Sequence, residues 1–335
     1  MLLSIIIVNY RSTRYIIDCL QSAGPVLMQN EEIEWIIVDN DSNDDCQNQI
    51  GSLFPQVQFL QMGYNAGFAR ANNAGIKIAK GAHVLLLNPD TLLPENCILK
   101  TVERLAASDF VACGVQLVHA DKTPQFSGSY FTKGGLNHLL ELPYWGKMVK
   151  WVANLLNVSK PSFIQVEKEI KVDWVSGAFL MVKKTAIEKA GLLDEDFFLY
   201  AEEVEWCSRL GKVGPLCLYG DIHVVHLIGT TIQQTTNSID NSYTNLSDKK
   251  GLQLMVSNHV RIRKQYGVLW FIFLLLNYTW AVPYAFLASV IMQIIKGKSP
   301  LTEMGYLSGF AKNIGTLWSM FPTIIKGKEY FYKFI

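Results

Sequence analysis

Polar side chains follow each of the four apolar runs in the first 90 residues, and their types are suited to binding a ligand. Asn9 and Tyr10 follow the first run, and residues 39–41, 65–68 and 88–90 follow the next three. Asparagine and aspartate are also ordinary turn residues, so one such motif indicates little. In a parallel sheet, however, ligands bind beyond the carboxyl ends of the strands. We therefore expect the polar residues that follow the four runs to line one site.

The chemistry at that edge suits a nucleoside. A nucleoside needs an aromatic or backbone wall beside its base, a carboxylate that accepts from base or ribose donors, and glycines that let the backbone approach closely. Asp39 provides such a carboxylate, and Gly67 provides such a glycine.

Asp90 is the candidate ligand of a divalent cation. It follows the most hydrophobic run and a proline, which places one carboxylate where Mg²⁺ or Mn²⁺ would bridge diphosphate oxygens. One aspartate cannot hold such an ion by itself. His226, which ends the apolar run 222–225, is the candidate second ligand. A histidine at this place is equally compatible with a purely structural role.

Three glutamates, Glu202, Glu203 and Glu205, lie at the start of a helix predicted over 201–210. The helix dipole favours carboxylates at a helix N-terminus whether or not they take part in chemistry. The alternative is a general base that takes the proton of an attacking hydroxyl. Adjacent carboxylates can face opposite ways there, so Glu202 and Glu203 need not share a role.

The elements that must position these residues are strands alternating with helices, which indicates an α/β fold. The runs 3–8, 35–38, 57–60 and 84–87 are mostly apolar, and 5–8 and 84–87 do not alternate with polar residues. Such strands are covered on both faces, as parallel strands between helix layers are. The sequence therefore predicts a mixed, mostly parallel central sheet between helices.

The pattern changes along the 335 residues, which exceed one average domain. Residues 118–172 carry aromatic residues without a clean period and are interpreted as an insertion or lid. Residues 173–232 return to strand and helix patterns, and 233–250 are interpreted as a polar loop. We therefore predict one domain over 1–232, with halves 1–117 and 173–232 on either side of the insertion, and a separate C-terminal region over 233–335.

The C-terminal region has the composition of a membrane-contacting segment. Residues 265–295 contain no charged side chain, and 268–276 are continuously apolar. A bilayer span needs roughly twenty apolar residues. Two polar residues and a proline interrupt the stretch, however, and basic residues flank it, which suits a helix pair in the membrane interface. A buried helix or a contact between copies of the chain is the third interpretation.

Composition excludes several classes of protein. Thirty Lys and Arg residues against twenty-nine Asp and Glu residues give a net charge of +1, so no overall positive field gathers nucleic acid. The six cysteines lie far apart without a CxxC pair, which favours a reducing compartment over a disulfide or zinc framework. The N-terminus lacks a basic segment and reaches polar residues too soon for an export signal.

Five stretches together resemble the inverting nucleotide-sugar glycosyltransferases of family two, which have the GT-A fold, and in particular their rhamnosyltransferase-like branch. They are residues 5–10 (IIIVNY), 37–42 (IVDNDS), 65–75 (NAGFARANNAG), 86–90 (LLNPD) and 173–207, which contains WVSGAF and EEVEW. The resemblance covers residues 2–232, of which 118–172 match more loosely. It makes 1–117 the nucleotide-binding half and 173–232 the acceptor half.

The resemblance implies roles for the candidate residues. The base and ribose would be held by Val8, Asn9, Tyr10 and Asp39, and the nucleotide pocket would be lined by Asn65, Gly67 and Asn72. The stretch Asn88, Pro89 and Asp90 looks like a degenerate DXD motif, with the metal held by Asp90 and His226.

On the acceptor side, Trp174 and Gly177 look like wall residues, and Glu203 matches the catalytic base. Aspartate is usual at the positions of Glu203 and Glu205, and glutamate is one methylene longer. Because attack requires near-contact geometry, either the helix lies slightly further back or Glu202 takes the role.

The resemblance implies transfer of a sugar from a nucleoside diphosphate donor, dTDP-rhamnose or a UDP-sugar, to a glycan acceptor with inversion, assisted by Mg²⁺ or Mn²⁺. The acceptor is expected on a lipid carrier in bacterial surface polysaccharide synthesis. We accordingly expect residues 265–295 to contact the cytoplasmic face of the cell membrane. Whether copies of the chain form a homo-oligomer is left open by the sequence.

Other functions stay open at this point. A sugar nucleotidyltransferase has a related core but needs a Gly-rich, basic phosphate loop after the first strand, where residues 9–12 contain no glycine. A membrane-bound scaffold or carbohydrate-binding module with a vestigial nucleotide site comes from a different class. A dinucleotide-dependent oxidoreductase is disfavoured because residues 63–67 lack the full GxGxxG spacing.

Overall fold

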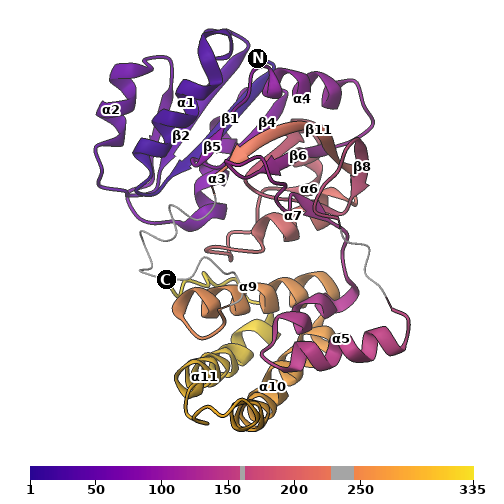
Figure 1. Cartoon of the computed structure of the whole chain (residues 1–335). Coiled ribbons are helices and arrows are strands. Elements are labelled where there is room, and N and C mark those ends of the chain that lie inside the picture. The colour runs from indigo at the N-terminus through magenta and orange to yellow at the C-terminus, as the bar shows by residue number, and fades with distance from the viewer. Residues whose placement is uncertain (159–162, 228–244) are drawn as a thin grey trace. The chain divides into compact units, whose positions relative to one another are not determined.

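The computed structural model describes residues 1–158, 163–227 and 245–335. Within them the chain forms two compact units (Figure 1). The first contains residues 1–130, 163–198 and 202–227, and the second contains 131–158, 199–201 and 245–335. Each unit has its own core and is described by itself.

The first unit is built on one mixed sheet, which has nine strands in the described part of the chain (Figure 1). The order across it is β3 (Gln58–Gln61), β2 (Ile33–Asp39), β1 (Leu3–Asn9), β4 (His83–Leu87), β10 (Phe179–Lys183), β6 (Ala112–Val118), β11 (Leu216–His226) and β5 (Thr91–Leu92), with β8 (Glu169–Val172) also paired to β11. The four apolar runs form β1 to β4, which are parallel neighbours. Antiparallel β10 lies between β4 and β6, so the sheet is mixed, as predicted.

Helices cover both faces of this sheet because successive side chains of a strand point to opposite faces. The helices of the first unit are α1 (Thr13–Met28), α2 (Cys46–Leu53), α3 (Gly67–Ile78), α4 (Cys97–Ala106), α6 (Lys184–Ala190) and α7 (Glu202–Leu210). Ile5 and Ile7 of β1 belong to one core cluster with residues of α1, α2 and α4. Ile6 belongs to a second cluster with residues of α3, α6 and α7. Because burial of one isoleucine contributes about 1.5–3 kcal/mol, this pattern fixes the register of β1.

β3 departs from the prediction that all four runs are covered on both faces. It begins at Gln58, one residue later than expected, and its residues are partly or fully exposed. The reason is its place in the sheet: β3 is the edge strand and pairs with β2 alone. Edge strands have less of the sheet around them to bury their side chains.

All six cysteines are free, buried thiols. Burial raises the pKa of the Cys97 thiol to about 12, so it stays protonated at neutral pH. The predicted absence of a disulfide framework is confirmed.

The second unit is helical in its described residues. It contains the 3₁₀ segment η1 (Lys133–Glu141) and the helices α5 (Trp145–Leu155), α9 (Lys249–Tyr266), α10 (Val268–Ile295) and α11 (Met304–Lys326). Its core includes Leu139, Met255, Leu274 and Phe310, one from each of η1, α9, α10 and α11. A polar contact reinforces it, because the Glu303 carboxylate accepts from the Tyr144 hydroxyl at 2.6 Å.

The stretch 118–172, expected to form one insertion, is divided between the two units. Residues 118–130 and 163–172 lie in the first unit, and 131–158 lie in the second. The physical reason is the burial of apolar side chains in and next to η1. Leu139 and Leu142 pack in a core that also contains residues of α9 and α10. The functional division of the chain stays a prediction.

Most of the uncharged stretch 265–295 forms one long helix, α10, while residues 265 and 266 end α9. It is thus not the helix pair that one of the interpretations expected. Asn277 and Thr279 do not interrupt it, because their side chains donate to the carbonyls of Phe273 and Leu275 one turn earlier, at 2.9 and 2.8 Å. Among the described residues, α10 is the one helix long and apolar enough to cross a membrane. Of the predicted loop 233–250, residues 233–244 lie outside the described residues, and Lys249 already begins α9.

Candidate functional site

The carboxyl ends of β1 and β2 place Asn9 beside Asp39. The two residues are register partners, and Asn9 Nδ2 donates to Asp39 Oδ1 at 3.0 Å. Gln61, at the end of β3, donates to the other oxygen, Oδ2, at 2.7 Å. Three parallel strands thus orient one carboxylate, which stays partly exposed for a ligand. Val8 and Tyr10, on either side of Asn9, are also partly buried.

Asp44 belongs to the same group, although the sequence analysis did not single it out. Its Oδ2 accepts from the Thr13 hydroxyl at 2.7 Å, and its Oδ1 accepts from Asn9 Nδ2 at 3.3 Å. A cavity of about 240 Å³ is lined by Asp39, Asp44 and Gln61 among others. The available signal was the density of aspartates and asparagines over 39–45, but turn residues give the same signal.

Asn65 and Gly67 are held by Asn40, which directly follows β2. Asn40 Oδ1 accepts from the Ala66 amide at 2.7 Å, and its Nδ2 donates to Asn65 Oδ1 at 3.1 Å. Gly67 has φ +72°, and a Cβ there would lie 2.2 Å from the carbonyl oxygen of Phe198. This glycine therefore allows a close approach to Phe198, where the sequence suggested approach to a ligand.

Asn72, the last predicted pocket residue, is buried in α3, and its Nδ2 donates to the Phe68 carbonyl at 2.9 Å. Its neighbour Asn73, which was not predicted, exchanges two hydrogen bonds with the backbone of Leu193, at 2.9 and 3.0 Å. Asn73 thereby docks the segment before α7 onto α3. The bond of Asn72 lies within α3, and in the part of the chain that the structure describes no hydrogen bond joins Asn72 to Asp39 or Asp90.

The predicted pair Asp90 and His226 is brought together at the end of β4 and β11. His226 Nε2 lies 3.4 Å from Asp90 Oδ1, and the two side chains are 12% and 6% exposed. Asn88 Nδ2 lies 3.3 Å from the same ring nitrogen. The pairing of β11 with β5 causes this proximity, because it sets His226 opposite Thr91, which follows Asp90.

The donor set of this pair fits a hard divalent cation only in part. In the part of the chain that the structure describes, no group of three or more His, Cys, Asp or Glu side chains could hold a metal ion. One carboxylate and one imidazole do fit Mg²⁺ or Mn²⁺ when substrate phosphates and water complete the coordination.

The three glutamates of α7 have three different environments. Glu205 is paired with Arg209 through contacts of 2.7 and 2.8 Å. Glu202 is 3% exposed, and its Oε2 has no hydrogen-bond partner among the described residues. Burial, and then the charge of Glu203, raise the pKa of Glu202 well above its ordinary range. Glu203 itself is partly exposed.

Glu203 faces the loop that contains Gly177. A methyl group at Gly177 would lie 3.5 Å from both Glu203 Cβ and Phe68 Cζ, so Gly177 lies next to both side chains. Trp174, in the short strand β9 (Trp174–Val175), pairs with β7 (Gly128–Ser129), and its ring lies 5.5 Å from that of Phe126.

A backbone hydrogen bond links the segment of Asp90 to the loop that lies next to Glu203. The Asn88 amide donates to the Ala178 carbonyl at 3.0 Å, and Ala178 follows Gly177. One edge of the first unit therefore contains the carboxyl ends of β1, β2 and β4 and the start of α7.

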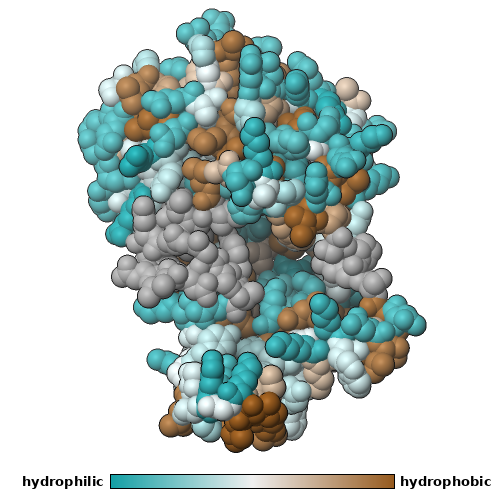
Figure 2. Space-filling view, in the orientation of Figure 1, coloured by the Kyte–Doolittle hydropathy of each residue, from teal (hydrophilic) through white to brown (hydrophobic). Residues whose placement is uncertain are grey.

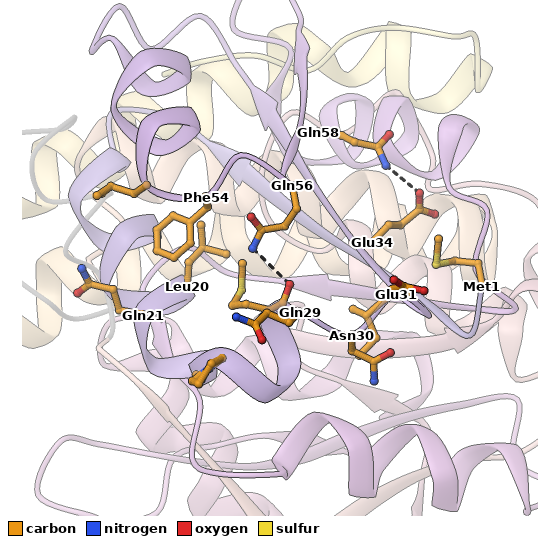
Figure 3. A pocket seen from close by; sticks show the side chains of 15 residues that line it. Met1, Leu20, Gln21, Gln29, Asn30, Glu31, Glu34, Phe54, Gln56 and Gln58 are labelled. Atoms are coloured by element: carbon orange, nitrogen blue, oxygen red, sulfur yellow. Dashed lines mark hydrogen bonds between the residues drawn. The ribbon is translucent and has the colours of Figure 1, made fainter.

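A second cavity, of about 820 Å³, lies at the opposite, amino ends of β1, β2 and β3 (Figure 3). Its lining includes Met1, Glu34 and Gln58 and none of the predicted site residues. Its buried carboxylate, Glu34, already accepts hydrogen bonds from Gln58 Nε2 at 3.0 Å and from the Lys80 amide. The candidate site residues therefore lie at the carboxyl edge and not at this cavity.

Comparison with known proteins agrees with this arrangement. The sequence profile of the family described as Glycosyl transferase family 2 matches residues 4–188, more than half of the chain. The chain belongs to this family. The resemblance to this family found in the sequence is confirmed.

Two curated relatives are the low-salt glycan biosynthesis hexosyltransferase Agl10 of Haloferax volcanii and the N-acetylglucosaminyl-diphospho-decaprenol L-rhamnosyltransferase of Mycobacterium tuberculosis. Each is 28% identical to this chain, over 62% and 58% of its length. The alignments span 61% and 66% of the relatives' own lengths, less than two thirds in each case. The family and its rhamnosyltransferase-like character are thus supported.

A solved structure shows the fold. The mannosyltransferase PcManGT from Pyrobaculum calidifontis, in complex with GDP-Man and Mn²⁺, has a TM-score of 0.52 at 15% identity, and the match covers 97% of this chain and 85% of that one. The predicted GT-A-type fold of this chain is confirmed.

Proposed function

We propose that this glycosyltransferase moves a sugar from a nucleoside diphosphate donor to a glycan hydroxyl in one step with inversion at the anomeric carbon. The observation that carries the proposal is that Asp90 and His226 lie beside Asn88, whose amide donates to the carbonyl of Ala178. Gly177, the residue before Ala178, lies next to Glu203. A single displacement needs an anion-compensating group on the leaving side and a base on the attacking side. The edge contains residues suited to both.

Donor binding is assigned to the residues at the carboxyl ends of β1 and β2. Asp39, with one oxygen bonded by Asn9 and the other by Gln61, accepts hydrogen bonds from the base or ribose. Asp90 and His226 would hold a divalent cation, which would offset the charge on the leaving diphosphate. The Mn²⁺ in the PcManGT complex supports this assignment.

Glu203 is assigned as the base. Glu205 is paired with Arg209, and burial raises the pKa of Glu202, which favours the protonated form of that carboxyl. A protonated acid cannot accept the proton of the acceptor hydroxyl. Glu203 is partly exposed and lies next to Gly177.

The donor is proposed to be dTDP-rhamnose or a UDP-sugar, because the rhamnosyltransferase of Mycobacterium tuberculosis is among the relatives. That relative's name also contains a polyprenol diphosphate, which supports a lipid-linked acceptor.

Membrane contact is assigned to one face of α10. Side chains at least 36% exposed recur every three or four residues: Leu269, Phe273, Leu276, Trp280, Tyr284, Leu287, Ile291 and Ile294. Apolar surface over α10 is visible in Figure 2. The other face is buried in the core of the second unit, through Phe271, Leu274 and Tyr278. A helix with one face in protein and one apolar face exposed suits a position in the plane of the cytoplasmic membrane surface.

Calorimetry with dTDP and UDP, with and without Mn²⁺, tests the function, followed by hydrolysis of a panel of nucleotide sugars. We expect binding of one nucleotide to depend on Mn²⁺, and we expect the product of transfer to have the inverted anomeric configuration by NMR. A protein that binds glycans but neither nucleotide would be a scaffold with a vestigial site. Retention of configuration would contradict the single-step mechanism.

A further inference from the structure

We propose that Gln125 is a positioning residue that fixes the His226 imidazole as the tautomer with hydrogen on Nδ1, which turns an unprotonated Nε2 toward Asp90. The inference rests on the proposed cation site, because only an unprotonated ring nitrogen can bind a metal. Gln125 lies between β6 and β7, outside the motifs that the sequence analysis singled out.

The orientation of the Gln125 amide follows from the backbone of His226. Gln125 Nε2 lies 2.6 Å from the His226 carbonyl oxygen, which can only accept a hydrogen bond. The nitrogen of the amide must therefore be on this side. The opposite orientation would place two oxygens against each other at that distance.

The tautomer of His226 follows from the amide. With its nitrogen facing the carbonyl, Gln125 presents Oε1 to His226 Nδ1 at 3.1 Å. An amide oxygen only accepts, so Nδ1 must carry the hydrogen. In the neutral ring Nε2 is then unprotonated, and it lies 3.4 Å from Asp90 Oδ1 and 3.3 Å from Asn88 Nδ2.

Gln125 is itself held rigidly. It is 5% exposed, and its amide donates to the Leu117 carbonyl of β6 at 2.8 Å. Its carbonyl accepts from Gln116 Nε2 and from the Ser127 hydroxyl, each at 2.9 Å. Its side-chain nitrogen also lies 3.1 Å from His119 Nδ1. A residue fixed at both ends can orient its partner, as groups that hydrogen-bond to metal-binding histidines do.

The alternative is a histidine that donates Nε2–H to Asp90 as a structural contact. In that arrangement the hydrogen occupies the position where the cation would bind, and Nδ1 faces Oε1 of Gln125 with two lone pairs opposed. The observed amide orientation disfavours this arrangement.

Nitrogen-15 NMR of the ring of His226 in the metal-free protein tests the tautomer directly. We expect the Nδ1–H form to dominate. Dominance of the Nε2–H form in the unmodified protein would overturn the inference without any variant.

Two variants test the role of Gln125. Gln125→Leu removes both hydrogen bonds to His226, so the Nδ1–H signature should be lost. Mn²⁺ affinity in the presence of the bound nucleoside diphosphate, measured by electron paramagnetic resonance, should fall about 10–100-fold. Gln125→Glu keeps an acceptor for Nδ1–H and should restore both readouts, even though its carboxylate against the His226 carbonyl lowers the melting temperature.

The outcomes separate the inference from the proposed function. Native Mn²⁺ affinity and tautomer in Gln125→Leu would overturn the role of Gln125. Equal losses in the Leu and Glu variants would show a merely structural role and would also overturn it. The Nδ1–H form in a protein that binds no Mn²⁺ would support the tautomer assignment and remove the cation from the proposed function.

Discussion

At the scale of single residues, identical side chains differ in function because their surroundings differ. Glu202, Glu203 and Glu205 lie within one turn of α7. One is buried with an unpartnered oxygen, one is partly exposed beside Gly177, and one is paired with Arg209. Burial, exposure and pairing set which carboxylate is ionised and accessible at neutral pH.

The first prediction concerns the base. Glu203→Gln should lower turnover about 10²–10⁴-fold while nucleotide binding stays unchanged, because an amide cannot accept the proton. Glu202→Gln is the matched control and should keep most activity, since burial favours the neutral form of that side chain. Radiolabelled sugar transfer and calorimetry measure the two quantities. Loss of activity in the Glu202 variant alone would move the base assignment to Glu202.

The second prediction concerns stability against pH. The pKa of Glu202 is higher in the folded than in the unfolded chain, whose ordinary value is 4.5, so the folded state binds the proton more tightly. The contribution is complete below that value and is lost as pH rises through the folded pKa. Glu202→Gln should therefore become more stable than the natural chain with increasing pH above about 4.5. Urea unfolding across this range checks the sign, and parallel curves would contradict the burial argument.

The third prediction separates backbone strain from steric contact at two glycines. Gly63 and Gly67 have φ of +73° and +72°, but only at Gly67 would a Cβ meet another atom, the Phe198 carbonyl oxygen at 2.2 Å. Gly63→Ala should cost about 1–2 kcal/mol of unfolding free energy from the left-handed backbone. Gly67→Ala should cost about 1–3 kcal/mol more, because the contact is added. Equal costs by chemical denaturation would show that the backbone yields at Gly67.

At the scale of elements, packing partners decide what a segment does. The apolar side chains of η1 and α5 pack with α9 and α10, so half of the expected insertion belongs to a helical unit. Sequence patterns show that a segment is amphipathic, but they do not show which partner covers its apolar face.

The fourth prediction concerns the exposed face of α10. Leu287→Glu places a charge on a side chain that is 63% exposed and should weaken binding to anionic vesicles about tenfold or more, since burial of one leucine contributes about 1.5–3 kcal/mol. Leu53→Glu, in the first unit, is a control with 54% exposure. Co-sedimentation with vesicles measures the difference. Equal binding by both variants would exclude α10 as the contact surface.

At the scale of the whole molecule, the second unit combines two distant parts of the chain. Residues 131–158 share a core with 245–335. Deletion of 265–335 should therefore expose Leu139, Met255 and Ile262 and lower the soluble yield, because their apolar partners are removed. The yield of soluble protein measures this, and a fully soluble truncated chain would show that the remaining core suffices. Point substitutions on α10 are for this reason the better test of membrane contact.

The sequence by itself determined the parallel strands β1 to β4 and the polar residues at their ends. Continuous apolar runs are a local signal, and strands place the residues that follow them at one edge. The pairing of Asp90 with His226 could be predicted for the same reason, since both residues follow largely apolar runs.

Only the tertiary structure decided what depends on contacts between distant residues. The raised pKa of Glu202, the amide of Gln125 against His226 and the division of residues 118–172 depend on burial or on partners about a hundred or more residues away. Local patterns set which faces are apolar or polar, but burial and hydrogen bonding are properties of the folded neighbourhood. That is why the edge of the sheet was predictable and the roles of the side chains on it were not.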